Sequence, residues 1–323
     1  MRDRDDVQSG PTRNRGIHGL AIHLSGLTLI LLVAGALVTS NDAGDSVPDW
    51  PLSFGRWLIH SDNFVANVRY EYSHRFLAGI VGVTTFLLAV WIWLRDGRPW
   101  MRRLALVMFA GVVAQALIGG VRVLLPAYKP LIAVPHALIA QSFFGLVVSV
   151  VVFTSRNWIA ARAIKSDAGS PSLRGLSTIS VGAVLIQLVL GAAFRHQAFG
   201  IVPHIVGAVA VTVVVVWTSS IAIRRHGDIA SLRRPAVVGI GLVFIQLCLG
   251  VGAYLARVAS QGDPQPLEPM ISLTAAHLVV GALTLATMLV LTLRAGRLLL
   301  PVAKTAEDGT RKVSPSEAQG VTV

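Results

Sequence analysis

Cysteine is nearly absent from this sequence: among 323 residues, Cys248 is the single one. An intramolecular disulfide is therefore excluded, and a metal site built from thiolates is disfavoured. Cys248 lies within an apolar segment, so we expect it to be a small residue packed in the core.

Charged residues are also scarce, at 14% of the chain, against about a quarter in soluble proteins. Hydrophobic residues make up 54% of the chain, and the mean hydropathy is +0.66. This composition predicts an all-α integral membrane protein whose chain crosses the bilayer several times. The net charge of +12 could suggest nucleic-acid binding. The placement of the basic residues decides whether they serve nucleic-acid binding or membrane orientation.

Apolar runs of roughly 20 residues, the length that spans a bilayer, occur eight times. The first run begins too late and continues too long for a cleaved signal peptide, so we predict a retained helix after a cytoplasmic segment at 1–17. A polar tail at 298–323 is predicted to be disordered. The eight predicted transmembrane helices are 18–40, 70–94, 102–124, 132–154, 174–194, 203–223, 235–257 and 270–293.

Basic residues lie mostly on one side of these helices. Of the 28 Lys and Arg residues, 21 fall at the two ends of the chain or between the second and third, fourth and fifth, and sixth and seventh helices. The positive-inside rule therefore predicts that both termini are cytoplasmic, in a multi-pass protein of the cell (inner) membrane. This asymmetry is typical of a protein whose partner is membrane lipid. It accounts for the net charge, so no nucleic-acid partner is expected. On the outer side, the loop at about 41–69 is the longest.

A helical hairpin recurs four times along the chain. In three helices a glutamine precedes a glycine by four residues and an arginine follows at the outer end, within Gln115–Arg122, Gln187–Arg195 and Gln246–Arg257. The repeat predicts two pseudo-symmetric four-helix bundles, at 18–165 and 166–297. We interpret the glutamine and glycine positions as sites of helix packing and inter-helix hydrogen bonding.

The helix that follows in each hairpin carries a histidine near its start: His74, His136, His204 and His277. These helices all enter from the outer side, so the four side chains lie at equal depth. His74 with His136, and His204 with His277, could each bracket one planar guest, as axial ligands bracket heme iron. One such histidine alone is more simply a hydrogen-bonded residue at a helix end, and zinc usually needs three or four converging ligands. Four histidines in register favour heme.

Charged residues stand beside the predicted heme sites. Glu71 precedes His74 by three residues and shares its helix face. It is either a helix N-terminal acid stabilised by the macrodipole or a carboxylate at a heme edge that moves protons or stabilises a developing cation. The corresponding positions of the second half are Ile201 and Thr274, so the first half alone looks equipped for chemistry. Four arginines at the outer boundary either snorkel to lipid phosphates or pair with heme propionates: Arg75, Arg122, Arg195 and Arg257.

The first outer loop contains Thr39–Gly55, a segment rich in Asn, Asp, Gly and Pro that predicts specific turns. Its counterpart in the third hairpin is only a short turn. Trp50, Phe54 and Trp57 could lie at the membrane interface or cover a site. The length of this loop suggests a lid over the first half.

Three features together resemble the heme A synthase family of cytochrome oxidase assembly, over about 18–297. They are the loop SNDAGDSVPDWPLSFG, the EYSHR that opens the second helix, and the histidines that open helices four, six and eight. The resemblance implies an oxidoreductase that converts heme O to heme A by oxidising a methyl group to formyl through successive hydroxylations, with heme b as a bound cofactor. On that pattern Glu71 is catalytic, His74 and His136 serve the substrate heme near the outer face, and His204 and His277 ligate heme b.

The resemblance also implies that a heme O synthase supplies the substrate and that heme-copper oxidase subunit I receives the product. This chain departs from some members because its first outer loop lacks a cysteine pair, which removes any thiol-based hand-off step. Two alternatives stay open: a diheme cytochrome b-type electron-transfer protein, and a non-enzymatic carrier, which the position of the histidines at one face disfavours. Small-residue helix faces permit a homo-oligomer without requiring one.

Overall fold

The computed structural model describes residues 14–167, 169–261 and 267–301. Eight of the described helices are long and apolar enough to cross a membrane, which confirms the predicted all-α multi-pass architecture. Their ends differ from the predicted bounds by a few residues. They are α1 (Arg15–Ser40), α2 (Val68–Arg95), α3 (Pro99–Leu124), α4 (Lys129–Thr154), α6 (Leu173–Arg195), α7 (Ile201–His226), α8 (Ala230–Ala259) and α9 (Met270–Leu298).

Short elements join these helices. Two 3-10 turns, η1 (Ser61–Asn63) and η2 (Pro126–Tyr128), and one short helix, α5 (Arg156–Ala160), lie between the spans. The strand β1 (Lys165–Ser166) pairs in parallel with β2 (Leu299–Leu300), directly after α9. This pairing ties the connection between α5 and α6 to the end of α9, and the sequence did not predict it. Most of the predicted polar tail, 302–323, lies outside the described residues, as does 1–13.

Local side-chain contacts explain where several helices begin. The side chain of Asn14 accepts hydrogen bonds from the backbone of Gly16 and Ile17 and so caps α1. The buried carboxylate of Asp167 accepts hydrogen bonds from the first two backbone N–H groups of α6. Pro99 stands in the first turn of α3, where its missing N–H has no intrahelical partner to lose.

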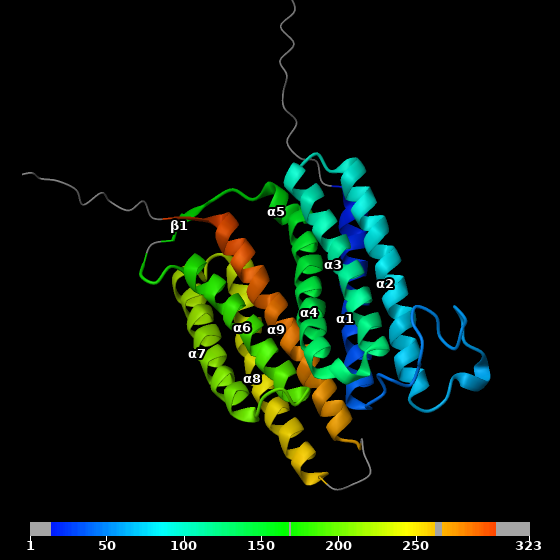
Figure 1. Cartoon of the computed structure of the whole chain (residues 1–323). Helices are drawn as coiled ribbons and strands as arrows, with labels where there is room; N and C mark the ends of the chain where they lie inside the picture. Colours follow the sequence, from blue (N-terminus) through cyan, green and yellow to red (C-terminus); the bar gives the residue numbers. More distant parts are fainter. Residues whose placement is uncertain (1–13, 168, 262–266, 302–323) are drawn as a thin grey trace, which may run out of the picture.

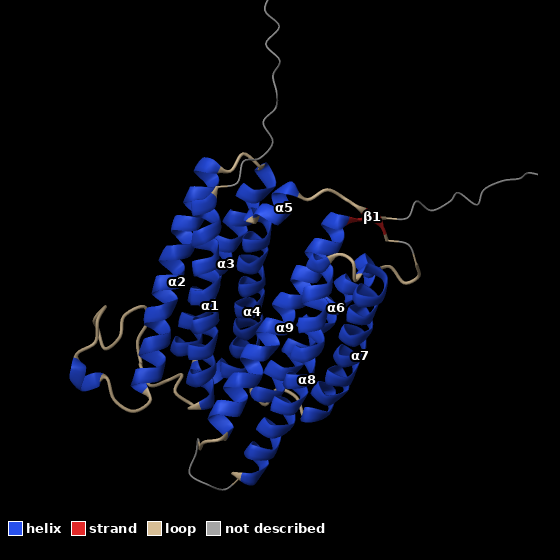
Figure 2. Cartoon of the chain, turned by 180° about the vertical axis from the view of Figure 1, so that it is seen from behind, coloured by secondary structure: helices blue, strands red, loops and turns tan. Residues whose placement is uncertain are grey.

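The helices pack as two groups of four (Figures 1 and 2). In the first group α1 and α3 each pack against α2 and α4, and in the second α6 and α8 each pack against α7 and α9. Each group has a buried apolar cluster, which includes Leu88 and Met108 in the first and Val215 and Leu291 in the second. The groups meet where α9 packs against α1 and α4, and where α4 packs against α6.

A third cluster of small and apolar side chains fills the boundary between the groups. Leu32 of α1, Phe144 of α4, and Ala282 and Ala286 of α9 are all buried there. Both ends of the described chain lie on the same side of the helices, at the top of Figure 1. We call the opposite side, which carries the long loop between α1 and α2, the outer side.

Cys248 corrects one expectation from the sequence. Its side chain is exposed on α8, as are those of Phe244 one turn before it and Val251 three residues after it. The interpretation of Cys248 as a core residue is therefore wrong. In a membrane-spanning helix this exposed apolar face meets lipid, which accommodates a thiol as readily as a core does.

The boundary cluster gives a prediction about stability. Ala282 is fully buried between α9 and its neighbours, so Ala282→Leu should overpack the boundary and destabilise the fold by about 1–3 kcal/mol. We expect a lower unfolding temperature in detergent. The matched control is Ala110→Leu, because Ala110 is exposed on α3 and its extra atoms meet only lipid or detergent. Equal unfolding temperatures for the two variants would contradict this account of the packing.

Candidate functional site

Each of the four histidines lies against a glycine of the preceding long helix. A Cβ atom added to Gly35 would stand 3.3 Å from Nε2 of His74. Added to Gly119, it would stand 3.1 Å from Cε1 of His136. A Cβ atom added to Gly191 would stand 2.9 Å from Cε1 of His204. One added to Gly250 would stand 2.9 Å from Cε1 of His277. Because glycine has no side chain, the edge of the histidine ring occupies the space beside it. Small residues permit such close approach between membrane helices.

In three of the four hairpins, a glutamine one turn before the glycine bonds to the same histidine. Nε2 of Gln115 donates to the backbone oxygen of His136 at 3.0 Å, and Nε2 of Gln187 donates to that of His204 at 2.9 Å. Nε2 of Gln187 also lies 3.0 Å from Nδ1 of His204. In the last hairpin, Nδ1 of His277 lies 3.2 Å from the backbone oxygen of Gln246. The interpretation of the repeated glutamine and glycine as packing and hydrogen-bonding positions is confirmed.

The structure brings His204 and His277 together. Their ring centroids are 6.2 Å apart and their planes are inclined by 75°. Two metal–nitrogen bonds of about 2 Å each fit within this separation, so one iron atom could lie between the rings. His74 and His136 also lie close enough to interact electrostatically. Among the residues that the structure describes, no three His, Cys, Asp or Glu side chains converge on one point, which disfavours zinc at either pair.

Aromatic side chains accompany the second pair. The ring of Phe194 lies nearly parallel to that of His204, with centroids 6.4 Å apart. The ring of Tyr254 lies 6.5 Å from that of Phe194. The guanidinium of Arg257 stands 5.0 Å from the centre of the Phe194 ring. Phe194 stands three residues after the repeated glycine of α6. The residue at the corresponding position of α3 is Arg122. The two histidine pairs therefore have different neighbours.

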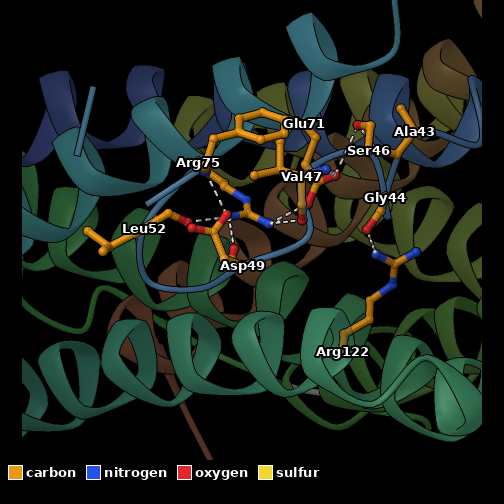
Figure 3. Close-up of polar contacts among 10 residues, drawn as sticks. Ala43, Gly44, Ser46, Val47, Asp49, Leu52, Glu71, Arg75 and Arg122 are labelled. Carbon is orange, nitrogen blue, oxygen red and sulfur yellow. Dashed lines mark hydrogen bonds and ion pairs between the residues drawn. The ribbon is translucent and has the colours of Figure 1, made fainter. Parts of the chain in front are cut away.

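Glu71 is buried on α2, one turn before His74, and Figure 3 shows its contacts with the outer loop. Its carboxylate accepts hydrogen bonds from Oγ of Ser46 and from the backbone N–H of Val47, each at 3.0 Å. The other carboxylate oxygen lies 2.6 Å from Nη2 of Arg75. The sequence placed Glu71 and Arg75 near the site, but not these contacts with the loop, because they join residues that are far apart in the chain.

Arg75 fastens the same loop. Its guanidinium donates to the backbone oxygens of Asp49 at 2.6 Å and of Leu52 and Val47, each at 3.0 Å (Figure 3). Together with Glu71, these carbonyls occupy both terminal nitrogens of Arg75. The loop segment 43–52 is therefore held on α2 by a buried ion pair and several hydrogen bonds.

The loop is also held on α3. Arg122 donates to the backbone oxygen of Gly44 at 2.9 Å. The indole of Trp50 packs so closely on Gly120 that it leaves no room for a Cβ atom there. The double glycine of α3 thus serves two contacts, since Gly119 receives His136 and Gly120 receives Trp50. The pair of adjacent glycines was the signal that could have revealed this contact, and sequence reasoning missed it.

The outer end of α1 connects the two groups of helices. Arg195 of α6 donates to the backbone oxygen of Thr39 at 2.7 Å. Oγ of Ser40 lies 2.7 Å from Oγ1 of Thr274, one turn before His277 on α9. The helix whose Gly35 contacts His74 is therefore bonded to two helices of the second group.

Two titratable groups near the outer ends have lowered pKa values. Burial raises the pKa of Asp49, but hydrogen bonds from the backbone of Gly55 and Phe54, together with the charge of Arg75, outweigh it, so the pKa lies below its usual value. Burial, with the charges of Arg195 and Arg122, lowers the pKa of His196 to about 4. Asp49 is therefore ionised and His196 neutral at neutral pH.

Comparisons with known proteins agree with this geometry. The sequence profile of the cytochrome oxidase assembly protein family (COX15-CtaA) matches residues 18–203, which include Glu71, His74 and His136. A heme A synthase of Shouchella clausii is 34% identical over 136 residues, which are 42% of this chain and 44% of that protein. One of Alkalihalophilus pseudofirmus is 33% identical over 123 residues, 37% of this chain and 40% of that protein.

A heme A synthase of Bacillus licheniformis matches a longer stretch, with 26% identity over 226 residues, 69% of this chain and 63% of that protein. The matches to Shouchella clausii and Alkalihalophilus pseudofirmus span less than half the length of those relatives. The family profile, in contrast, extends from α1 to the start of α7. The chain therefore belongs to the family of cytochrome oxidase assembly proteins.

Proposed function

We propose that this chain is a heme A synthase, a membrane oxidoreductase that oxidises a methyl group of heme O to formyl and so supplies heme A for cytochrome oxidase. The observation that carries the proposal is the inequality of its two histidine pairs. His74 lies one turn after a buried carboxylate that is bonded to the outer loop, while the rings of His204 and His277 lie 6.2 Å apart with Phe194 stacked beside His204. The names of the relatives support the same activity.

In this proposal the first four-helix half, 18–165, binds heme O as substrate through His74 and His136. The second half, 166–297, is a pseudo-symmetric bundle that holds heme b as cofactor through His204 and His277. The excess of Lys and Arg beside the chain ends supports a cytoplasmic location of both termini in the cell (inner) membrane. Both heme sites then lie near the outer face, with heme O synthase as supplier and heme-copper oxidase subunit I as recipient.

The residues of the second pair fit a heme iron. The side-chain oxygens of Gln187 and Gln246 are buried, and no hydrogen-bond partner is found for them in the described part of the chain. A histidine that binds iron through Nε2 keeps its proton on Nδ1, and a neighbouring amide oxygen is the usual kind of acceptor for it. The backbone oxygen of Gln246 lies 3.2 Å from Nδ1 of His277 and so suits the role of that acceptor. When bound, heme b supplies the electron-transfer chemistry that no side chain offers.

The residues of the first site bind and orient the substrate and manage protons. The loop 43–52 excludes water from the outer side, because Arg75, Arg122 and Trp50 hold it on α2 and α3. With water as the oxygen source, each of the two successive hydroxylations releases two protons and two electrons. Glu71 would accept protons, and the electrons would pass through the heme b held by His204 and His277 to an external electron acceptor. Loss of water from the resulting gem-diol gives the formyl group.

The arginines divide between two roles. Arg75 is occupied by the loop carbonyls and by Glu71, so we assign it to holding the loop rather than a propionate. Arg122 and Arg195 each make one described hydrogen bond through one terminal nitrogen, and Arg257 stacks on Phe194. These three retain donors that suit the carboxylates of heme propionates.

Heme analysis tests the proposed activity. The chain is expressed with a heme O synthase in cells that lack other sources of heme A, and extracted hemes are separated by chromatography and identified by mass. We expect the formyl-bearing heme A. The facing rings of His204 and His277 would equally suit a diheme cytochrome b-type electron-transfer protein, so recovery of heme b alone would contradict the proposal and select that second candidate.

Glu71→Gln gives a sharper test of the catalytic assignment. The variant keeps the shape of the side chain but removes its charge, so heme A formation should fall roughly a hundredfold or more. Heme b content should stay unchanged, because Glu71 lies at the other pair. Glu268→Gln is the matched control, since Glu268 is an exposed carboxylate on the outer side. A Glu71→Gln protein that made as much heme A as the control would remove Glu71 from the mechanism.

Gly250→Ala tests the glycine contact. The added methyl group would lie 2.9 Å from the ring of His277, so the ring must move and heme b retention should drop. The control is Gly241→Ala on the same helix, where no atom lies within 4 Å of the added methyl group. Heme b absorbance per purified protein measures the difference. If both variants retained heme b equally, the contact would not position the ligand.

A further inference from the structure

The outer loop exposes a cluster of large apolar side chains. Within residues 54–66, the side chains of Trp57 and Leu58 are 75% and 68% exposed, and Phe54, Phe64 and Val65 are also exposed. This segment lies between the fastened part of the loop and α2, outside the eight helices that could cross a membrane. Several large apolar side chains exposed within one short loop segment mark an interaction surface.

The segment lies beside α2, on the side away from the other helices. Figures 1 and 2 both show it displaced sideways from α2 and level with the outer turns of that helix, rather than beyond its end. Phe64 fixes this placement, because its ring contacts Tyr72 of α2 edge-on, with centroids 6.3 Å apart. The segment is therefore at the depth where α2 enters the bilayer.

The apolar cluster continues a stripe on α2. Phe76, Ile80 and Val83 follow Tyr72 at helical spacings of three and four residues, and all three are exposed. Such a stripe on a membrane-spanning helix faces lipid. Because Phe64 touches Tyr72 at the outer end of this stripe, the loop cluster and the lipid-facing side of α2 form one apolar surface.

The polar residues of the segment match a bilayer interface. Arg56 and Arg69 are exposed at its two ends, and the guanidinium of Arg69 stacks 4.9 Å from the centre of the Tyr70 ring. Tryptophan and tyrosine are enriched at the headgroup level, and arginine there binds lipid phosphates. Asp62, which lies 3.1 Å from His60, is the one acidic residue in 54–69, so the two arginines give this stretch more basic than acidic side chains.

We propose that residues 54–66 form an interfacial anchor whose apolar side chains, led by Trp57 and Leu58, insert into the outer leaflet of the membrane. The partner is the lipid surface itself. Since the same loop continues from the segment held by Glu71 and Arg75, the anchor fixes the depth of that segment in the bilayer. The anchor does not depend on the proposed enzymatic activity.

Site-directed spin labelling tests the anchor. Trp57→Cys and Leu58→Cys are made separately in a Cys248→Ala background, and the full-length proteins are labelled and reconstituted in phosphatidylcholine–phosphatidylglycerol vesicles. The native Cys248, exposed on α8, is the lipid-facing control. Gln261→Cys, exposed in the other long loop on the outer side, is the aqueous control. Collision of the label with oxygen is compared with its collision with a water-soluble nickel chelate.

Spin labels at both loop positions should collide with oxygen and with the nickel chelate in a ratio like that of a label at Cys248. Their oxygen-to-nickel ratio should exceed that of Gln261→Cys roughly fivefold or more, because oxygen partitions into the apolar phase and the chelate stays in water. A ratio equal to that of Gln261→Cys at either position would overturn the proposal. Low accessibility to both reagents would also overturn it, because that result indicates burial against protein, such as a second copy of the chain.

Discussion

The close contact between a histidine ring and a glycine of the preceding helix is the constraint on which the rest of this structure depends. It occurs in all four hairpins, and in two of them a single added methyl group would have to displace the ring. In a bilayer, burial of apolar surface does not by itself bring helices together, so close backbone approach and inter-helix hydrogen bonds fix their positions. The glycine sets the distance, and the hydrogen bonds from Gln115 and Gln187 set the height of the histidine-bearing helix.

One repeated contact supports two different environments. Glu71 and Arg75 form an ion pair that flanks His74 on α2, while Phe194 stacks beside His204 and contacts Tyr254. The difference arises at few positions: Ile201 stands where Glu71 would be, and α3 has Arg122 where α6 has Phe194. The bonds from the end of α1 to α6 and α9 hold the two environments next to each other. The proposed heme A synthase activity requires two unequal sites of this kind.

The sequence predicted the parts of this structure that depend on local pattern. Apolar length identified eight spans, and the in-register histidines identified the candidate ligands. It could not predict that Cys248 faces outward, because lipid and protein core select the same apolar residues. Nor could it predict the contacts of Ser46, Val47 and Trp50, since each joins a loop to a distant helix without a periodic signal. Charge patterning still led to Glu71, because a carboxylate is rare within an apolar span.

The two histidine pairs are proposed to have separate functions, and electron paramagnetic resonance of the purified protein distinguishes them. The account predicts that replacing His74 and His136 together with alanine leaves the low-spin signal of a bis-imidazole heme b unchanged. Replacing either His204 or His277 should abolish that signal, because each supplies one axial ligand. Loss of the heme b signal from the variant lacking His74 and His136, with the signal intact when His204 or His277 is replaced, would contradict the assignment.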